Sequence, residues 1–188
     1  SQKVVSIEPK DAEAHNNLAV MLQELGRSKE AETSYKKAIA VNPNYASAHN
    51  NLGVMLQDTH RFKEAQISFK QAISSQPDHG DAHYNLGVTL QELSLFAEAE
   101  VNLKQAIHLR PDFAEAHKNL GDVLQVLGRF SEAEVRFKKA IAIKPDFSDA
   151  FINLGMALKE LDSLEEAEAS FRQAIVLKPD SIMAYNKL

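Results

Sequence analysis

Residues 148–181 read SDAFINLGMALKELDSLEEAEASFRQAIVLKPDS, and the pattern of this 34-residue stretch recurs along the whole chain. The prolines share the same interval and stand at Pro9, Pro43, Pro77, Pro111, Pro145 and Pro179. Because proline is tolerated at few points of a helical unit, this even spacing indicates one repeated supersecondary unit. We expect a single array over 1–188, with full repeats 12–45, 46–79, 80–113, 114–147 and 148–181 and partial repeats 1–11 and 182–188.

Each repeat predicts two helices joined by a short turn. In 12–25 the apolar residues and His15 follow the i, i+3, i+4, i+7 spacing of a buried helical stripe, and a second helix is expected over about 29–41. Gly26 and Arg27 mark the turn between them. Asp112, followed three residues later by Glu115, predicts a capping box at the start of the next helix.

Glycine recurs in the middle of the first helix, at Gly53, Gly87, Gly121 and Gly155. A glycine inside a helix costs about 1 kcal/mol relative to alanine, so a neighbouring side chain is expected to need the space. The large residues at a shared position of the second helix are the expected partners: Tyr35, Phe69, Leu103, Phe137 and Phe171.

The repeat resembles the tetratricopeptide repeat. The family pattern of an aromatic residue, Leu-Gly, a later Ala-x3-Phe and a closing proline is matched by Phe151, Leu154-Gly155, Ala167, Phe171 and Pro179. Histidine replaces the usual aromatic residue at His15, His49, His83 and His117, and leucine replaces the usual tyrosine at Leu22, Leu56, Leu90, Leu124 and Leu158. The resemblance implies an all-α, right-handed superhelical solenoid of stacked antiparallel helix pairs, whose concave surface is lined mainly by the first helices.

The composition excludes several classes of function. The chain has 188 residues, a net charge of −5 and no cysteine, which argues against a nucleic-acid surface and excludes disulfides and thiolate chemistry. No apolar run is long enough to cross a bilayer, so we expect no membrane partner and a cytoplasmic location. The sequence has no His-Glu-x-x-His, phosphate-binding or Gly-x-Ser-x-Gly motif, and the four repeated histidines belong to the buried stripe. We therefore predict no catalytic residue, metal or cofactor.

The face opposite the buried stripe carries asparagine at one position of every full repeat, at Asn17, Asn51, Asn85, Asn119 and Asn153. Asparagine is a mediocre helix former, and its amide is both donor and acceptor. Such a column can pair with the backbone of an extended peptide, or it can bridge adjacent repeats and cap turns. It resembles the asparagine ladder in the repeat domain of O-linked N-acetylglucosamine transferases, a feature that other superhelical arrays share.

Further columns accompany the asparagines. Glutamine recurs at Gln57, Gln91 and Gln125, and valine recurs at Val54 and Val88, as a partner contact or as packing against the next repeat. With Tyr84 and Lys118, these residues and the five asparagines form the predicted peptide-binding set.

The charge on this face predicts the charge of the bound segment. Nine acidic residues stand against Lys118 and Lys159, a local balance of −7, so a neutral or basic extended segment is favoured. Receptors of acidic chaperone tails need a lysine–asparagine clamp, of which only Lys118 is present, so we predict against that subclass.

The predicted function is a protein–protein interaction scaffold. One alternative is the substrate-selecting arm of a larger enzyme, such as a glycosyltransferase, inactive alone. Another is end-to-end self-association through apolar residues near the two ends, namely Val4, Val5, Ile7, Ile182, Tyr185 and Leu188.

Overall fold

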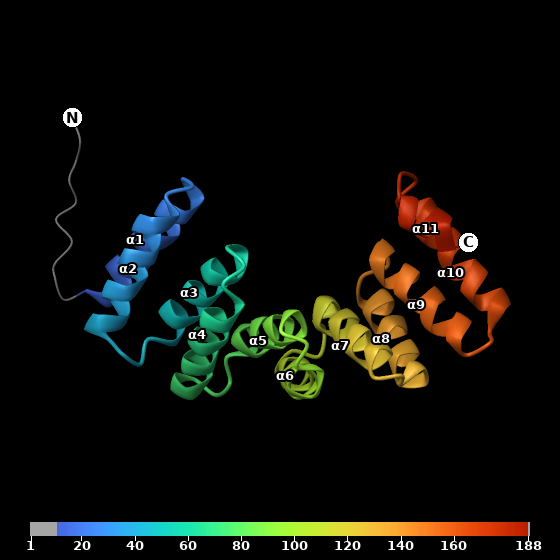
Figure 1. The fold of residues 1–188 in the computed structure, drawn as a ribbon, viewed down its shortest axis with the longest axis horizontal. Coiled ribbons are helices and arrows are strands. Elements are labelled where there is room, and N and C mark those ends of the chain that lie inside the picture. The colour runs from blue at the N-terminus through green and yellow to red at the C-terminus, as the bar shows by residue number, and fades with distance from the viewer. Residues whose placement is uncertain (1–10, 188) are drawn as a thin grey trace. The chain divides into compact units, whose positions relative to one another are not determined.

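A computed structural model describes residues 11–187, which form helices joined by short turns and contain no strand (Figure 1). The helices are α1 (Ala12–Glu24), α2 (Ser28–Val41), α3 (Ala46–Asp58), α4 (Phe62–Ser75), α5 (Gly80–Glu92), α6 (Phe96–Leu109), α7 (Ala114–Val126), α8 (Phe130–Ile143), α9 (Ser148–Glu160), α10 (Leu164–Leu177) and α11 (Ile182–Lys187). The predicted bounds of the first two helices are confirmed to within one residue.

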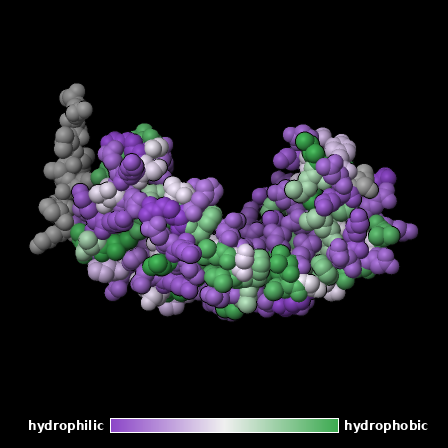
Figure 2. All heavy atoms as spheres, viewed as in Figure 1, coloured by the Kyte–Doolittle hydropathy of each residue, from purple (hydrophilic) through white to green (hydrophobic). Residues whose placement is uncertain are grey.

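The chain divides into two compact units, Ser1–Leu93 with α1 to α5 and Ser94–Leu188 with α6 to α11. In the first unit α1 packs on α2 and α3 on α4, and α2 and α4 each also contact the next helix. In the second unit α7 packs on α8 and α9 on α10, while α11 contacts α9 and α10. Hydrophilic residues predominate on the surface that Figure 2 shows, with hydrophobic residues in small groups among them. The prediction of one array over 1–188 stays a prediction.

The predicted contact between helix-one glycines and helix-two aromatic rings is confirmed within both units. A Cβ atom added at Gly53 would lie 2.6 Å from Cε1 of Phe69, and one added at Gly155 would lie 2.5 Å from Cε1 of Phe171. Gly121 meets the ring of Phe137 in the same way. The three rings are at most 2% exposed, so each of these three helix pairs closes around a buried aromatic side chain.

The turn inside each repeat has a left-handed backbone at one repeat position. Gly26 and Gly128 have φ of 72°, and the equivalent residues His60, Ser94 and Asp162 have φ of 58° to 61°. Only glycine adopts this conformation without a steric cost, which explains why glycine marks the turn in two repeats.

The capping box predicted at Asp112 is wrong. The N-cap of α7 is Phe113, which makes no side-chain cap hydrogen bond. The Phe113 N–H donates to the carbonyl of Arg110 at 3.2 Å, so the turn closes one residue later than predicted and Asp112 lies outside the cap position. The Arg110 guanidinium lies 3.5 Å from the centre of the Phe113 ring, a cation–π contact that covers the start of the helix.

The repeated histidines tie the first helix of a repeat to the preceding proline. The Nε2 atoms of His49, His83 and His117 lie 2.8 to 3.0 Å from the carbonyl oxygens of Pro43, Pro77 and Pro111. A neutral ring with a proton on Nε2 donates this bond. Burial lowers the pKa of His117, which favours the neutral form. The histidines therefore close the turn between repeats.

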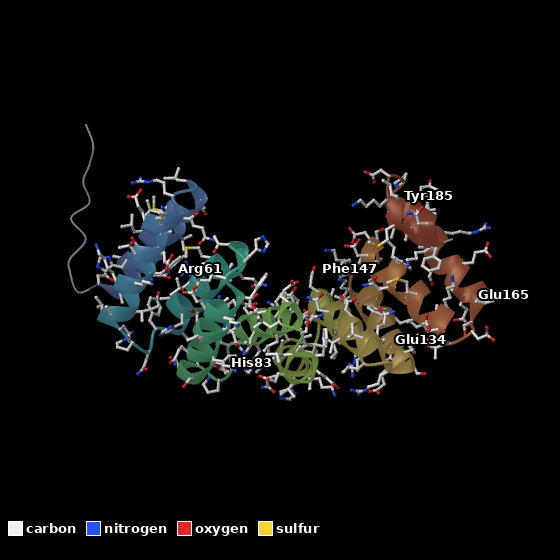
Figure 3. The ribbon with its side chains drawn as sticks, in the orientation of Figure 1. Arg61, His83, Glu134, Phe147, Glu165 and Tyr185 are labelled. Atoms are coloured by element: carbon white, nitrogen blue, oxygen red, sulfur yellow. The ribbon has the colours of Figure 1, made fainter. Side chains whose placement is uncertain are left out.

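Arg61, labelled in Figure 3, links two repeats through its guanidinium group. Its Nη1 lies 2.7 Å from Oε2 of Glu32 and its Nη2 lies 2.6 Å from Oε2 of Glu64. Arg129 joins Glu100 and Glu132 equivalently in the second unit. These bridges connect the second helix of one repeat to the turn of the next.

Glu32→Gln is expected to destabilise the fold by about 0.2–1 kcal/mol at pH 7, the range of partly exposed ion pairs. Hydrogen bonds from Arg61 and then Lys36 lower the pKa of Glu32 from 4.5 to about 2. The stabilisation is therefore present above pH 4.5 and is lost as the pH falls towards 2. Urea denaturation of both proteins between pH 7 and 2 should show the difference shrinking. Glu165→Gln is the control, because Glu165 is exposed without an ion pair among residues 11–187; an equal effect there would contradict the assignment.

The described residues bear in part on the predictions of end-to-end self-association and of no membrane partner. Ile182 and Tyr185 on α11 are 75% and 55% exposed, while Val4, Val5, Ile7 and Leu188 lie outside the described residues, and self-association stays a prediction. Within 11–187, no helix combines the length and the apolar character needed to cross a membrane.

Candidate functional site

Every residue of the predicted peptide-binding set lies on the first helix of its repeat. The first unit holds Asn17 on α1, then Asn51, Val54 and Gln57 on α3, and Tyr84, Asn85, Val88 and Gln91 on α5. The second unit holds Lys118, Asn119 and Gln125 on α7 and Asn153 on α9. Asn17 is exposed and the others are half-buried, so none of them is a core residue.

In the first unit the asparagine amides form a hydrogen-bonded chain across three helices. Asn51 Nδ2 donates to Asn16 Oδ1 at 3.1 Å, which links α3 to α1, and Asn85 Nδ2 donates to Asn50 Oδ1 at 3.1 Å, which links α5 to α3. Longer bonds of 3.4 and 3.5 Å join the neighbours Asn16 to Asn17 and Asn50 to Asn51. All donors point the same way along the chain, from Asn85 to Asn17, an arrangement in which each bond polarises the next.

The sequence-based set omitted Asn16 and Asn50, which this chain of amides requires. They are 6% and 9% exposed, far more buried than the asparagines that follow them. Their side-chain oxygens accept the hydrogen bonds that position the amides of Asn51 and Asn85. The signal was present in the sequence as the consecutive pairs Asn16-Asn17 and Asn50-Asn51.

The amides of Asn17 and Asn51 keep unused hydrogen-bonding capacity despite these bonds. An asparagine amide has two N–H donors and two acceptor sites on its oxygen. Asn51 uses one donor towards Asn16 and one acceptor site towards Asn50, which leaves one of each at a half-buried position. Asn17 uses a single acceptor site and is exposed. The amides therefore bridge repeats and still present donors and acceptors at the surface.

The second unit makes the equivalent bridge with different chemistry. Lys118 stands at the repeat position of Asn16 and Asn50, and its ammonium group has no acceptor for the next asparagine. Asp122, one turn later, supplies that acceptor: Asn153 Nδ2 donates to its Oδ1 at 2.6 Å. Lys118 Nζ lies 2.7 Å from the other oxygen of Asp122 and balances its charge. Gln125 Nε2 also donates to the backbone carbonyl of Asn153 at 3.1 Å.

The carboxyl group of Asp122 has a raised pKa. Burial raises its pKa, while Lys118 and the hydrogen bond from Asn153 act in the opposite direction. Lys118 is thus engaged in an ion pair on α7, and it can contact a ligand only alongside Asp122.

A pocket of about 420 Å³ opens beside the ladder in the first unit. It is lined by Val20, Gln23 and Glu24 from α1, Tyr35 from α2, and Asn51 and Val54 from α3. Asn51 belongs to both the pocket and the amide chain, so the two features form one continuous site. Tyr35 is 1% exposed, and its hydroxyl donates to Gln23 Oε1 at 3.0 Å, which fixes the Gln23 amide at the pocket wall.

The first helices of the first unit carry charge of one sign. The helices α1, α3 and α5 contain Glu13, Glu24, Asp58, Asp81 and Glu92 and neither lysine nor arginine. Lysine occurs on the first helices α7 and α9 of the second unit. The preference for a neutral or basic segment stays a prediction, and these charges would favour it most at α1, α3 and α5.

Comparison with solved structures gives several close matches. The crystal structure of YrrB, described as a TPR protein with an unusual peptide-binding site, has a TM-score of 0.83 and 28% identity, covering 94% of this chain and 91% of that one. A MamA crystal structure has a TM-score of 0.82 and 25% identity, covering 89% and 92%. Pseudomonas aeruginosa PilF, with a TM-score of 0.77, 19% identity and coverage of 94% and 88%, shares the fold. No curated protein matches the sequence significantly.

Family models described as tetratricopeptide repeat match residues 10–78, 56–102, 89–146 and 127–188. Together they extend over both units and all five full repeats. The predicted all-α solenoid of antiparallel helix pairs is confirmed by this match and by the solved structures. The chain belongs to the tetratricopeptide repeat family.

Proposed function

We propose that the first helices of the first unit hold an extended peptide segment of a partner protein by hydrogen bonds to its backbone. The tetratricopeptide fold supports a protein–protein interaction scaffold with protein or peptide partners. The proposal adds the recognition element, the asparagine ladder of α1, α3 and α5, and it assigns the chain a binding role without catalysis.

The unused capacity of the ladder amides is the observation that carries the proposal. A peptide backbone presents an N–H and a C=O at every residue, and Asn51 offers the complementary pair. The bridging bonds to Asn16 and Asn50 restrict the amides before a ligand arrives, so less side-chain freedom is lost on binding. Recognition of this kind depends little on the peptide's sequence, because every residue supplies the same backbone groups.

The acidic first helices support a neutral or basic segment as the ligand. An acidic peptide would meet the carboxylates of Glu24 on α1 and Asp58 on α3, and neither helix carries a lysine or arginine. Electrostatic complementarity of this kind acts mainly on the association rate and on partner choice. Raising the salt concentration should therefore slow association with a basic peptide.

The experiment is a backbone scan of a bound peptide. Peptides are selected from a displayed random library on the full chain, and the tightest is synthesised with single backbone N-methyl groups. Each N-methyl that removes a donor to the ladder should weaken binding by about 0.5–1.5 kcal/mol, the net worth of one hydrogen bond. Alanine replacement of the same residues is the control and should cost less at most positions. If N-methylation weakens binding at no position, backbone recognition is excluded.

A further inference from the structure

We propose that the pocket beside Asn51 accepts an arginine side chain of the bound peptide, an inference that rests on the proposed function. The pocket is about 420 Å³, near the lower end of the ~300–1,000 Å³ that ligand pockets span. It opens at the ladder, where a peptide backbone held by Asn51 would pass. One long side chain leaving that backbone enters the pocket directly.

The wall of the pocket suits the aliphatic stem of such a side chain. Val20 and Val54 are half-buried and face the pocket from α1 and α3. The ring of Tyr35 closes it from α2. Arginine packs its methylene groups along apolar surface of this kind.

The rim of the pocket suits a cation. Glu24 lines the pocket, is exposed, and makes no ion pair within residues 11–187. Asp58 does not line the pocket but lies beside Gln23, which does. Among residues 11–187 it accepts one long bond, of 3.5 Å from Gln23 Nε2, so its carboxylate keeps most of its capacity. The planar guanidinium fork, with five donors, matches carboxylate oxygens better than an ammonium group does, which favours arginine over lysine.

Tyr35 organises the polar part of the pocket. The equivalent residues in the other repeats are Phe69, Leu103, Phe137 and Phe171, so a phenol hydroxyl occurs at this position only in the first repeat. Its donation to Gln23 Oε1 turns the Gln23 amide so that its nitrogen lies on the side of Asp58. The hydrogen bonds from Tyr35 to Gln23 and from Gln23 to Asp58 thus hold the Asp58 carboxylate next to the pocket wall.

The second unit provides an internal comparison four repeats later. A pocket of about 510 Å³ there includes Met156, Lys159, Glu160, Phe171 and Lys187, at the repeat positions of Val20, Gln23, Glu24, Tyr35 and Asn51. Two lysines replace two neutral amides, so this pocket repels a cation. Pockets at the same repeat positions thus carry different charge in the two units, and only the pocket of the first unit suits a basic side chain.

The test is a nuclear magnetic resonance titration of the full chain with two capped peptides, Gly-Ser-Gly-Arg-Gly-Ser-Gly and the same sequence with citrulline, the neutral isostere of arginine. The arginine peptide should shift the methyl signals of Val20 and Val54 and the side-chain amide of Gln23. It should bind about tenfold more tightly than the citrulline peptide, the ratio that one charge-assisted hydrogen bond supplies.

Glu24→Gln combined with Asp58→Asn should reduce the arginine peptide to the level of the citrulline peptide. Glu92→Gln is the matched control, because Glu92 occupies the repeat position of Glu24 on α5, outside the lining of this pocket, and it should leave the ratio unchanged. Tyr35→Phe, which introduces the residue found in three other repeats, should lower the ratio with the fold intact.

Separate signals distinguish the two proposals. Equal shifts of Val20, Val54 and Gln23 by both peptides, or an unchanged ratio in the Glu24 and Asp58 variant, would overturn the arginine pocket whatever the ladder does. The side-chain amides of Asn17 and Asn85, which do not line the pocket, report the ladder. If neither peptide shifts them, backbone recognition fails independently of the pocket.

Discussion

Phe69→Ala is expected to lower the free energy of unfolding by about 3–5 kcal/mol, the range for removing a fully buried aromatic side chain. Phe69 is 0% exposed, and its ring fills the space that Gly53 leaves open on α3. Removing the ring leaves a cavity between α3 and α4, and because each repeat is stabilised mainly by its neighbours, the packing of adjacent helices also weakens. Urea denaturation followed by circular dichroism measures the change, and hydrogen exchange localises it to α3 and α4.

Ile67→Ala is the matched control for Phe69→Ala. Ile67 lies two residues earlier on α4 and is 62% exposed, so its truncation should change the free energy of unfolding by about 0.5 kcal/mol or less. Similar losses in the two variants would contradict the assignment of Phe69 as the side chain that closes the helix pair.

The fold was largely predictable because one period fixes many positions at once. Aligning the repeats places Gly53, Gly121 and Gly155 opposite Phe69, Phe137 and Phe171, and the structure shows those contacts. The capping rule was less reliable, because a different local turn competes with it. At Asp112 the capping pattern is present, but the turn that the Phe113 N–H closes on the Arg110 carbonyl places the helix start one residue later, and the same turn recurs at Tyr45, His79 and Phe147.

The site was predictable as a surface but not as a network. A helical wheel identifies which face of a helix is open, and all twelve predicted residues lie on the first helices with none buried. It does not give the distance between side chains on successive first helices. The bonds from Asn51 to Asn16 and from Asn153 to Asp122 depend on that stacking distance. The bridging roles of Asn16, Asn50 and Asp122 therefore could not be predicted from the sequence.

Replacing Asn17, Asn51 and Asn85 together by alanine is expected to weaken binding of a selected peptide by about 1.5–4.5 kcal/mol, three times the net worth of a single hydrogen bond. The three residues belong to one unit and to one chain of amides, so their loss removes both the surface groups and the ordering that fixes them. Isothermal titration calorimetry with the tightest selected peptide measures the change.

The fold should tolerate this substitution, which separates binding from folding. Loss of the bridges from Asn51 and Asn85 costs about 1 kcal/mol each, and alanine's higher helix propensity offsets part of that cost. Circular dichroism at 25 °C should therefore show unchanged helicity. Gln71→Ala with Gln76→Ala is the control, because it truncates two exposed amides in and directly after α4, outside the predicted peptide-binding set, and should leave affinity unchanged. Unchanged affinity in the asparagine variant would mean that the ladder serves only to bridge the repeats.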